Sequence, residues 1–221
     1  MSDYVPDEAT ARADLCRFLS ACYYEPAPEF AEEKLFDSLL TAARQVHPDL
    51  TEQARKLGEA FALQDLQTLL VDYTRLFIGP MHALAPPYGS TWLNTPAPAE
   101  GNPPPAVLDL YSEGGFDIDA DFRELPDHVA VELEFLYLLT FNINRADAAA
   151  DPAGSAATMA LRGRFLHEHL GAWIGSFAAA VKAGADTVFY RELADFTEQY
   201  VRMEVARPPD SAGAPGLYRV Q

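Results

Sequence analysis

The stretch VAVELEFLYLLTFNI, residues 129–143, is the most apolar in the chain, and it indicates the fold class. It carries only two acidic residues, Glu132 and Glu134, and its fifteen residues fall short of the roughly 20 that a membrane-spanning helix needs. Pro126 suits the first turn of an α-helix, because the amide hydrogen that proline lacks would be unpaired there anyway. The stretch therefore predicts a long apolar helix from Pro126 to about Ala146, without a membrane span.

The helical period continues in both directions from this stretch. Apolar side chains recur every three or four residues, and prolines and glycines mark the points where helices end. No alternation typical of a β-strand lasts for more than a few residues. Further helices are predicted over residues 7–24, 28–46, 49–63, 65–77, 104–113, 156–183 (with a bend near Gly171 or Gly175) and 187–206.

The pattern as a whole predicts an all-α, single-domain helical bundle of about eight helices. The bundle spans residues 1–206, with a long Pro-rich loop over 78–105 in its middle, and residues 207–221 form a loose tail. A proline-rich loop of this length inside a compact domain is uncommon and is usually functional or disordered. The large side chains of Tyr88 and Trp92 favour an ordered, packed loop.

The charge balance limits the classes of partner. The 221 residues include 16 Lys and Arg against 33 Asp and Glu, which gives a formal charge of −17. Such a surface repels the phosphates of nucleic acids and attracts a basic peptide, although many soluble proteins are simply acidic. The sequence therefore predicts no nucleic-acid partner.

The first residues and the two cysteines predict a cytoplasmic protein. Residues 1–8 have neither the basic nor the apolar region of a secretory signal. Cys16 and Cys22 lie on different faces of one predicted helix, about 9 Å apart along its axis. A disulfide between them would unwind the helix, so we expect two small buried side chains in a reducing compartment.

Motifs for catalysis and for cofactors are largely missing. GxGxxG, GxxxxGK[ST], HExxH and CxxC do not occur, so no bound cofactor and no metal are predicted. Glu124, Asp127, His128 and Glu132 nevertheless lie within nine residues, and a helical metal-dependent hydrolase built on them is an alternative. The plainer interpretation is a helix N-terminus, where the carboxylates complement the helix dipole and His128 binds a neighbouring loop.

A group of aromatic, proline and methionine side chains surrounds the end of the predicted helix over 65–77. An aromatic stripe at helical spacing is usually core. Prolines that stiffen a loop beside aromatics and a methionine also describe a surface for an apolar peptide, and both interpretations stay open. The group consists of Tyr73, Leu76, Phe77, Met81, Pro86, Pro87, Tyr88 and Trp92.

Two parts of the sequence resemble the signatures of a known family. The first signature of the TorD/DmsD family resembles DYTRLFIGP (72–80) with PPYGSTW (86–92). The members of this family are cytoplasmic chaperones for molybdenum-containing oxidoreductases. ELPDH (124–128) with ELEFL (132–136) resembles the second. The resemblance covers about residues 10–205, and it implies an all-helical bundle that catalyses no reaction.

The resemblance also implies a partner. Members of the family bind the twin-arginine signal peptide of a molybdoenzyme catalytic subunit until its cofactor is in place, some bind its folded body, and guanine-nucleotide binding has been proposed for some. Met81 stands where relatives often carry Trp, and Tyr88 where some do, so the identity of the partner enzyme stays open. The choice between monomer and homodimer also stays open. The matching positions are Tyr73, Leu76, Phe77, Pro86, Pro87, Tyr88 and Trp92 in the first signature, and Asp127 and His128 in the second.

These positions suggest how a leader would bind. An apolar surface near Leu76, Phe77 and Trp92 would bury the apolar part of the leader as a helix in a groove. Asp127 would pair with an arginine, and His128 would donate to a carbonyl or orient the aspartate. The acidic surface would raise the rate of encounter with the basic part. A plain helical scaffold, without leader binding, is a third possibility.

Overall fold

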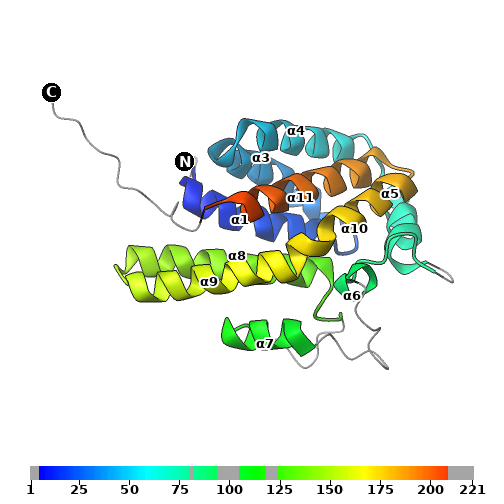
Figure 1. Ribbon diagram of the computed structural model, residues 1–221. Helices are drawn as coiled ribbons and strands as arrows, with labels where there is room; N and C mark the ends of the chain where they lie inside the picture. Colours follow the sequence, from blue (N-terminus) through cyan, green and yellow to red (C-terminus); the bar gives the residue numbers. More distant parts are fainter. Residues whose placement is uncertain (1–4, 80–81, 94–104, 118–123, 209–221) are drawn as a thin grey trace.

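The structure is a computed structural model that describes residues 5–79, 82–93, 105–117 and 124–208, with the backbone alone at 105–106. Its regular structure is helical apart from one isolated β-bridge in these ranges (Figure 1). The elements are α1 (Glu8–Cys22), α2 (Glu29–Glu32), α3 (Leu35–Val46), α4 (Pro48–Ala62), α5 (Leu66–Tyr73), the π-helical turn η1 (Thr74–Ile78), α6 (Gly89–Trp92), α7 (Pro105–Glu113), α8 (Val129–Ala148), α9 (Pro152–Glu168), α10 (Leu170–Gly184) and α11 (Val188–Ala206).

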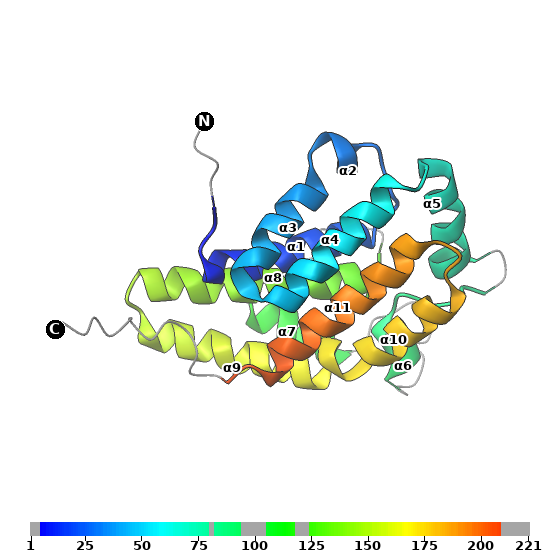
Figure 2. The ribbon, with the colours of Figure 1, turned by 90° about the horizontal axis from the view of Figure 1, so that it is seen from above.

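The helices form stacked layers. In Figure 1, α3 and α4 lie uppermost, α1 and α11 lie in the middle, and α8 and α9 lie below them, above α7. The main packing pairs are α1 with α8 and with α3, α3 with α4, α11 with α10 and with α4, and α8 with α9. Figure 2 shows α11 between α4 and α10. The all-α bundle predicted from the sequence is therefore confirmed.

Two predicted helices are divided in the structure. The helix expected over 28–46 is broken at Lys34, whose φ of 53° is left-handed, so that α2 and α3 are separate. The helix expected over 156–183 is broken at His169, two residues before Gly171, where a bend was predicted. A Cβ at Gly171 would lie 2.2 Å from the Leu166 carbonyl oxygen and 2.6 Å from Val205 Cγ2. Glycine is therefore required for α10 to start this close to α9 and α11.

The long apolar helix starts later than predicted. α8 begins at Val129, with His128 as its N-cap, and Pro126 lies in a turn outside the helix. The prediction that Pro126 opens the helix was wrong, because the backbone between Pro126 and Val129 is engaged by another segment, described below. The expectation of a loose tail falls largely on residues 209–221, and Met81 and much of the Pro-rich loop also lie outside the described residues.

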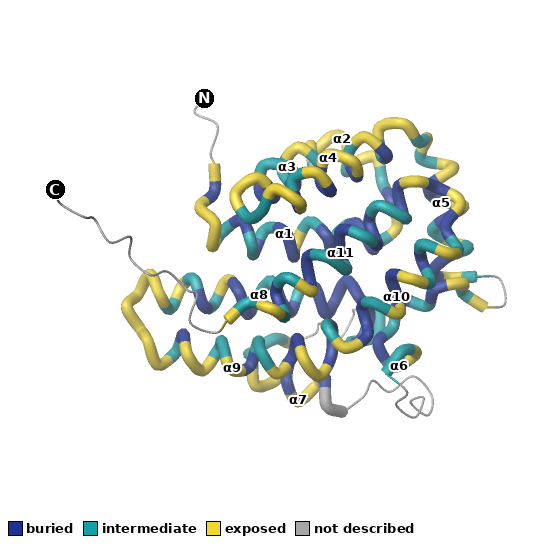
Figure 3. The backbone as a smooth tube through the Cα atoms, turned by 45° about the horizontal axis from the view of Figure 1, so that its top comes forward, coloured by how far each residue is buried: buried dark blue, intermediate teal, exposed yellow. Residues whose placement is uncertain are grey.

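The core runs along the middle of the bundle. Figure 3 shows buried positions concentrated on α8, α10 and α11, while α2 is exposed. Trp173 and several tyrosine and phenylalanine rings are fully buried. Cys16 and Cys22 are buried free thiols, as predicted. Among the described helices, none is long and apolar enough to cross a membrane.

Candidate functional site

The two sequence signatures meet in an antiparallel β-bridge between Tyr88 and His128. The Gly89 amide donates to the Asp127 carbonyl at 2.9 Å, and the Val129 amide donates to the Pro87 carbonyl at 2.8 Å. Two backbone hydrogen bonds thus hold the start of α6 against the start of α8. Segments that are about forty residues apart in the sequence form one local unit, and this pairing also delays the start of α8.

Asp127 holds α6 in place. Its Oδ2 accepts a hydrogen bond from the Ser90 amide at 2.9 Å, and the residue is buried. The expectation that Asp127 projects from the first turn of the long helix was therefore wrong, because that helix begins two residues later. Since Asp127 is enclosed, it can reach a ligand only if α6 moves, and its role in this structure is to position α6.

His128 is a buried N-cap with two aromatic neighbours. Its Nδ1 accepts a hydrogen bond from the Ala130 amide at 3.1 Å, which satisfies one of the free donors at the start of α8. The imidazole stacks on the Tyr24 ring at 6.1 Å between centroids and meets the Tyr88 ring edge-on at 5.4 Å. Burial lowers the pKa of His128 to about 4, so the ring is neutral at pH 7.

Glu132 lies beneath α6 and is fully buried. Its Oε2 accepts from the Trp173 indole N–H at 3.0 Å. Burial, and next the charge of Asp127, raise the pKa of Glu132 well above its ordinary value, which favours the protonated acid. A Cβ at Gly89 would lie 2.9 Å from Trp173 Nε1 and 3.2 Å from Glu132 Oε1, so glycine lets α6 sit directly on this pair.

The four residues of the hydrolase alternative do not converge. Glu124 accepts from the Tyr88 hydroxyl at 3.2 Å, while Asp127, His128 and Glu132 face Ser90, Ala130 and Trp173. In the parts of the chain that the structure describes, no group of three His, Cys, Asp or Glu side chains could hold a metal ion. The arrangement gives the hydrolase alternative no support.

Part of the predicted apolar groove belongs to the core. Leu76 is 0% exposed and Phe77 is 5% exposed. The Phe77 ring packs edge-on against Tyr23, Tyr73 and Tyr190. The expectation of an exposed surface at these two residues was therefore wrong, because the π-helical turn η1 directs both side chains inward. Pro87 is also buried, Pro86 is half-buried, and Met81 lies outside the described residues.

The part of the site that solvent reaches is a cluster of tyrosines and glutamates. We call it the tyrosine–glutamate surface, and its half-buried members are Tyr24, Tyr73, Tyr88, Glu124 and Glu134. Tyr24 donates its hydroxyl to Glu134 at 2.9 Å, and Tyr88 donates to Glu124. Burial, followed by the charge of Glu124, raises the pKa of Tyr73 and of Tyr88 to about 12.

The two carboxylates of this surface have hydroxyl partners. Besides Tyr24, Ser20 donates its hydroxyl to Glu134 at 3.2 Å. Among the described residues, neither Glu124 nor Glu134 forms an ion pair with a basic side chain. The surface therefore keeps two negative charges beside three aromatic rings, a combination that suits a guanidinium group.

Three apolar side chains in the segments that follow Tyr73 and Tyr88 in the chain are partly or largely exposed. Trp92 is half-buried, its indole N–H donates to the Pro86 carbonyl at 2.9 Å, and its ring lies 6.3 Å from that of Phe177. Ile78 and Leu84 are 60% and 51% exposed. The Leu84 amide donates to the carbonyl of Arg75, so the segment that follows η1 folds back along it.

The family model of the nitrate reductase delta subunit matches residues 43–179, more than half of the chain. The chain belongs to this family. Similar proteins that are named TorD chaperones confirm the resemblance to the TorD/DmsD family. Chaperone protein TorD of Vibrio cholerae serotype O1 (strain M66-2) is 25% identical over 177 residues, which cover 76% of this chain and 78% of that protein.

Two further proteins named as chaperones are similar to this member of the nitrate reductase delta subunit family. Chaperone protein TorD of Psychrobacter sp. (strain PRwf-1) is 26% identical over 223 residues, covering 93% of this chain and 95% of that protein. The perchlorate reductase assembly chaperone protein of Dechloromonas aromatica (strain RCB) is 32% identical over 105 residues, 46% of each chain. A solved structure from Archaeoglobus fulgidus, assigned as a redox enzyme maturation protein, shows the same fold, with a TM-score of 0.50 and 19% identity over 86% of this chain and 93% of that one.

Several residues of this site do not stand out in the sequence. Tyr24 and Glu134 were not singled out, although Glu134 lies inside the second signature. Ile78 was missed because the helix predicted over 65–77 ended before it, whereas the π-helical turn η1 continues to Ile78. The one available signal was the order of the signatures, which indicates proximity in a shared family fold but not which side chains face solvent.

Proposed function

We propose that this protein is a cytoplasmic chaperone that binds the twin-arginine signal peptide of a molybdenum-containing oxidoreductase and assists its cofactor loading and assembly before export. The relatives named TorD and perchlorate reductase assembly chaperone support this proposal. The partner is the catalytic subunit, through its signal peptide and its folded body. The protein acts as a monomer or homodimer and catalyses no reaction of its own.

The tyrosine–glutamate surface is the observation that carries this proposal. A guanidinium group offers five N–H donors in a planar fork and a flat face, so it can pair with a carboxylate and stack on a tyrosine at the same time. Glu124 with Tyr88 would receive one arginine, and Glu134 with Tyr24 would receive the other. Tyr73, the third half-buried ring of this surface, would add aromatic area for a guanidinium group.

The apolar part of the leader would follow the exposed apolar side chains. Trp92, Ile78 and Leu84 offer partly or largely exposed apolar area in the segments that follow Tyr73 and Tyr88 in the chain. Asp127 and His128 would support leader binding without contacting the leader, because Asp127 fixes α6 and His128 fixes the start of α8. Their substitution would therefore weaken leader binding indirectly, by loosening α6, which begins after Tyr88 and ends at Trp92, and the start of α8, the helix that carries Glu134.

Calorimetric titration with a twin-arginine leader peptide tests the proposal. The double variant Glu124→Gln/Glu134→Gln keeps the shape of both side chains and removes both charges. We expect its affinity for the leader to fall by at least about tenfold, or ~1.4 kcal/mol. A leader in which both arginines are lysines should bind the parent protein more weakly, because lysine keeps the charge but loses the planar fork.

A matched control separates local pairing from net charge. Glu32→Gln/Glu33→Gln removes two charges from exposed positions at the end of α2, and we expect it to change the affinity by less than about twofold. Equal losses in both double variants would show that only the overall acidity matters. Equal affinities of the arginine and lysine leaders would contradict recognition of guanidinium groups.

A further inference from the structure

A pocket of about 910 Å³ opens at the end of the bundle away from the signatures. It lies between the start of α1, the last turns of α8, the outer part of α9 and the end of α11. Ligand pockets in proteins measure roughly 300–1,000 Å³, so the volume of this one falls within that range. It shares no residue with the tyrosine–glutamate surface.

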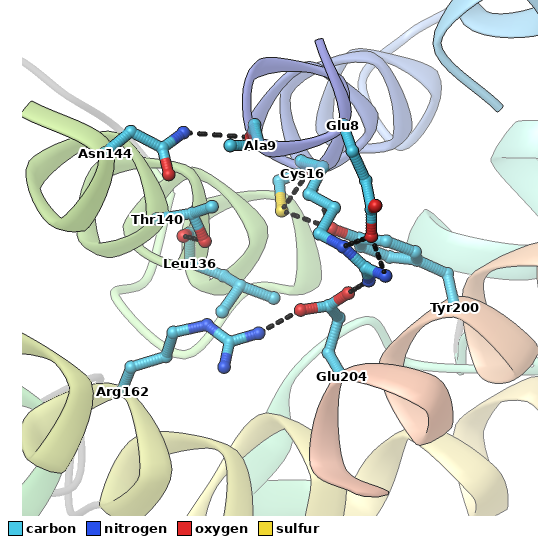
Figure 4. Close-up of polar contacts among 10 residues, drawn as sticks. Glu8, Ala9, Cys16, Leu136, Thr140, Asn144, Arg162, Tyr200 and Glu204 are labelled. Carbon is cyan, nitrogen blue, oxygen red and sulfur yellow. Dashed lines mark hydrogen bonds and ion pairs between the residues drawn. The ribbon is translucent and has the colours of Figure 1, made fainter. Parts of the chain in front are cut away.

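Three charged side chains close the inner end of this pocket. Glu204 of α11 is fully buried and receives Arg12 Nη1 of α1 at 2.5 Å on one carboxylate oxygen and Arg162 Nη2 of α9 on the other. We call Arg12, Glu204 and Arg162 the Arg–Glu–Arg brace. Figure 4 shows Glu204 and Arg162 of the brace, with Glu8 close by. Tyr200 donates its hydroxyl to the Arg12 carbonyl at 2.6 Å. The brace joins three helices through polar groups, so this end of the bundle does not close by apolar packing.

One wall of the pocket is a face of α9 made of small residues. Ala156, Ala160 and Gly163 line it, with Met159 between them. They lie on one side of the helix over about 10 Å of its length. A Cβ at Gly163 would meet no atom within 4 Å, so the wall borders open space. Small side chains on a helix allow another helix to approach closely, and the facing residues of α8 supply Ile143, Asn144 and Asp147.

The exposed charges at the mouth of the pocket are acidic. Asp7, Glu8 and Asp147 are exposed lining residues, and Arg207, which is half-buried, also lines the pocket. The Asp7 carboxylate caps α1 through the Thr10 amide at 2.8 Å, and this hydrogen bond lowers the pKa of Asp7, which keeps it ionised. Arg162, by contrast, is 12% exposed and tied to Glu204. A ligand that enters from solvent therefore meets negative charge first and apolar surface behind it.

We propose that this pocket binds an amphipathic α-helical segment of another protein, with its apolar face against α8 and α9 and a lysine or arginine at the acidic mouth. The shape argues for a helix, because α9 presents the small residues Ala156, Ala160 and Gly163 beside open space. The charge argues for a basic segment, because three exposed carboxylates line the pocket, one of them (Glu8) paired with Arg12, against the half-buried Arg207. The proposal does not depend on leader binding, since the two surfaces share no residues.

Fluorescence anisotropy with a designed probe tests this proposal. The probe is a labelled amphipathic peptide of about 16 residues, with leucine and alanine on one face and lysine on the other. Ala160→Trp should fill the pocket and weaken probe binding by at least about tenfold, whereas Ala157→Trp, at an exposed α9 position that does not line the pocket, should change it by less than about twofold. Asp147→Lys should weaken binding more than Asp109→Lys, an equal change in net charge at an exposed position on α7.

Several results would overturn the proposal. These are no binding of the probe to the parent protein, equal losses in the pocket and control variants, and equally tight binding of a peptide with glutamate in place of every lysine. Displacement of the probe by a twin-arginine leader would show that the pocket belongs to the leader site. If the Glu124→Gln/Glu134→Gln variant lost the leader but kept the probe, the two sites would be separate, and failure of either one would leave the other standing.

Discussion

Removing the central charge of the Arg–Glu–Arg brace should destabilise the whole fold. Glu204→Gln keeps the shape of the side chain and one oxygen acceptor but removes the carboxylate. The side chains of Arg12 and Arg162 are each 12% exposed, so both guanidinium groups would remain charged in a poorly hydrated place. Burial acts to lower the pKa of Arg12, but Glu204 and Glu8 outweigh it and raise that pKa, so the carboxylates compensate the cost of burial.

The size of the effect follows from what each arginine retains. Breaking a buried ion pair by removing one partner typically costs about 3–5 kcal/mol. Arg12 keeps Glu8 at 2.8 Å, whose side chain is 60% exposed, and the new amide oxygen still accepts one hydrogen bond. We therefore expect a loss at the lower end, about 3 kcal/mol in the free energy of unfolding. For a chain of this length that corresponds to a fall in Tm of roughly 6–12 °C.

Urea unfolding followed by circular dichroism would measure this loss. Glu198→Gln is the control, because Glu198 also joins two basic residues, Lys182 and Arg202, but these are 36% and 70% exposed and can turn to water. We expect the control to lose less than about 1 kcal/mol. The triple variant Arg12→Met/Arg162→Met/Glu204→Leu should recover much of the stability, since apolar residues can replace a buried ion pair. A loss below about 1 kcal/mol for Glu204→Gln would refute the reasoning, because both arginines would then be hydrated without their partner.

Three further predictions concern the residues around the signatures. Because the folded-state pKa of His128, about 4, lies below its ordinary 6.5, its contribution to stability is present above pH 6.5 and is lost as the pH falls toward 4, by up to ~3 kcal/mol. His128→Asn keeps an acceptor for the Ala130 amide but cannot be protonated, so its urea midpoints at pH 7 and pH 4.5 should differ less than those of the parent protein. An equal difference in the variant and the parent would contradict the role of His128 in this pH dependence. Because the pKa of Glu132 is raised, its contribution to the stability of the fold is present below its ordinary pKa and is lost as the pH rises. Glu132→Gln still accepts a hydrogen bond from Trp173, so thermal melting at pH 8 should find this variant at least as stable as the parent protein. A lower Tm would count against a protonated Glu132. Leu76→Ala should cost about 2–5 kcal/mol in urea unfolding, and a loss below about 1 kcal/mol would contradict its burial.

The positions of most helices followed from the sequence because local signals determine them. Asp7, Asp65 and Thr187 each accept a hydrogen bond from the amide three residues later, and each precedes an apolar run with helical period. Such signals act over one or two turns, so they are legible without a structure. The all-α class and the buried free cysteines follow from the same short-range pattern.

Contacts between distant segments decided which side chains of the signatures reach solvent. The first turn predicted at Pro126 did not form, because residues 87–89 pair with the backbone between Asp127 and Val129. The same pairing buried Asp127 beneath α6, where its carboxylate accepts a hydrogen bond from the Ser90 amide. Periodicity carries no information about such a pairing, since it depends on how whole helices are placed.

The Arg–Glu–Arg brace illustrates the limit most clearly. Arg12, Arg162 and Glu204 are unremarkable in the sequence, and each resembles a solvent-exposed charge on its own helix. Helical period and capping describe what a segment does alone, and a single buried charge is strongly unfavourable in that description. Only when α1, α9 and α11 pack together do the three charges compensate one another, so only the tertiary structure could decide that they are buried and that a pocket opens beside them.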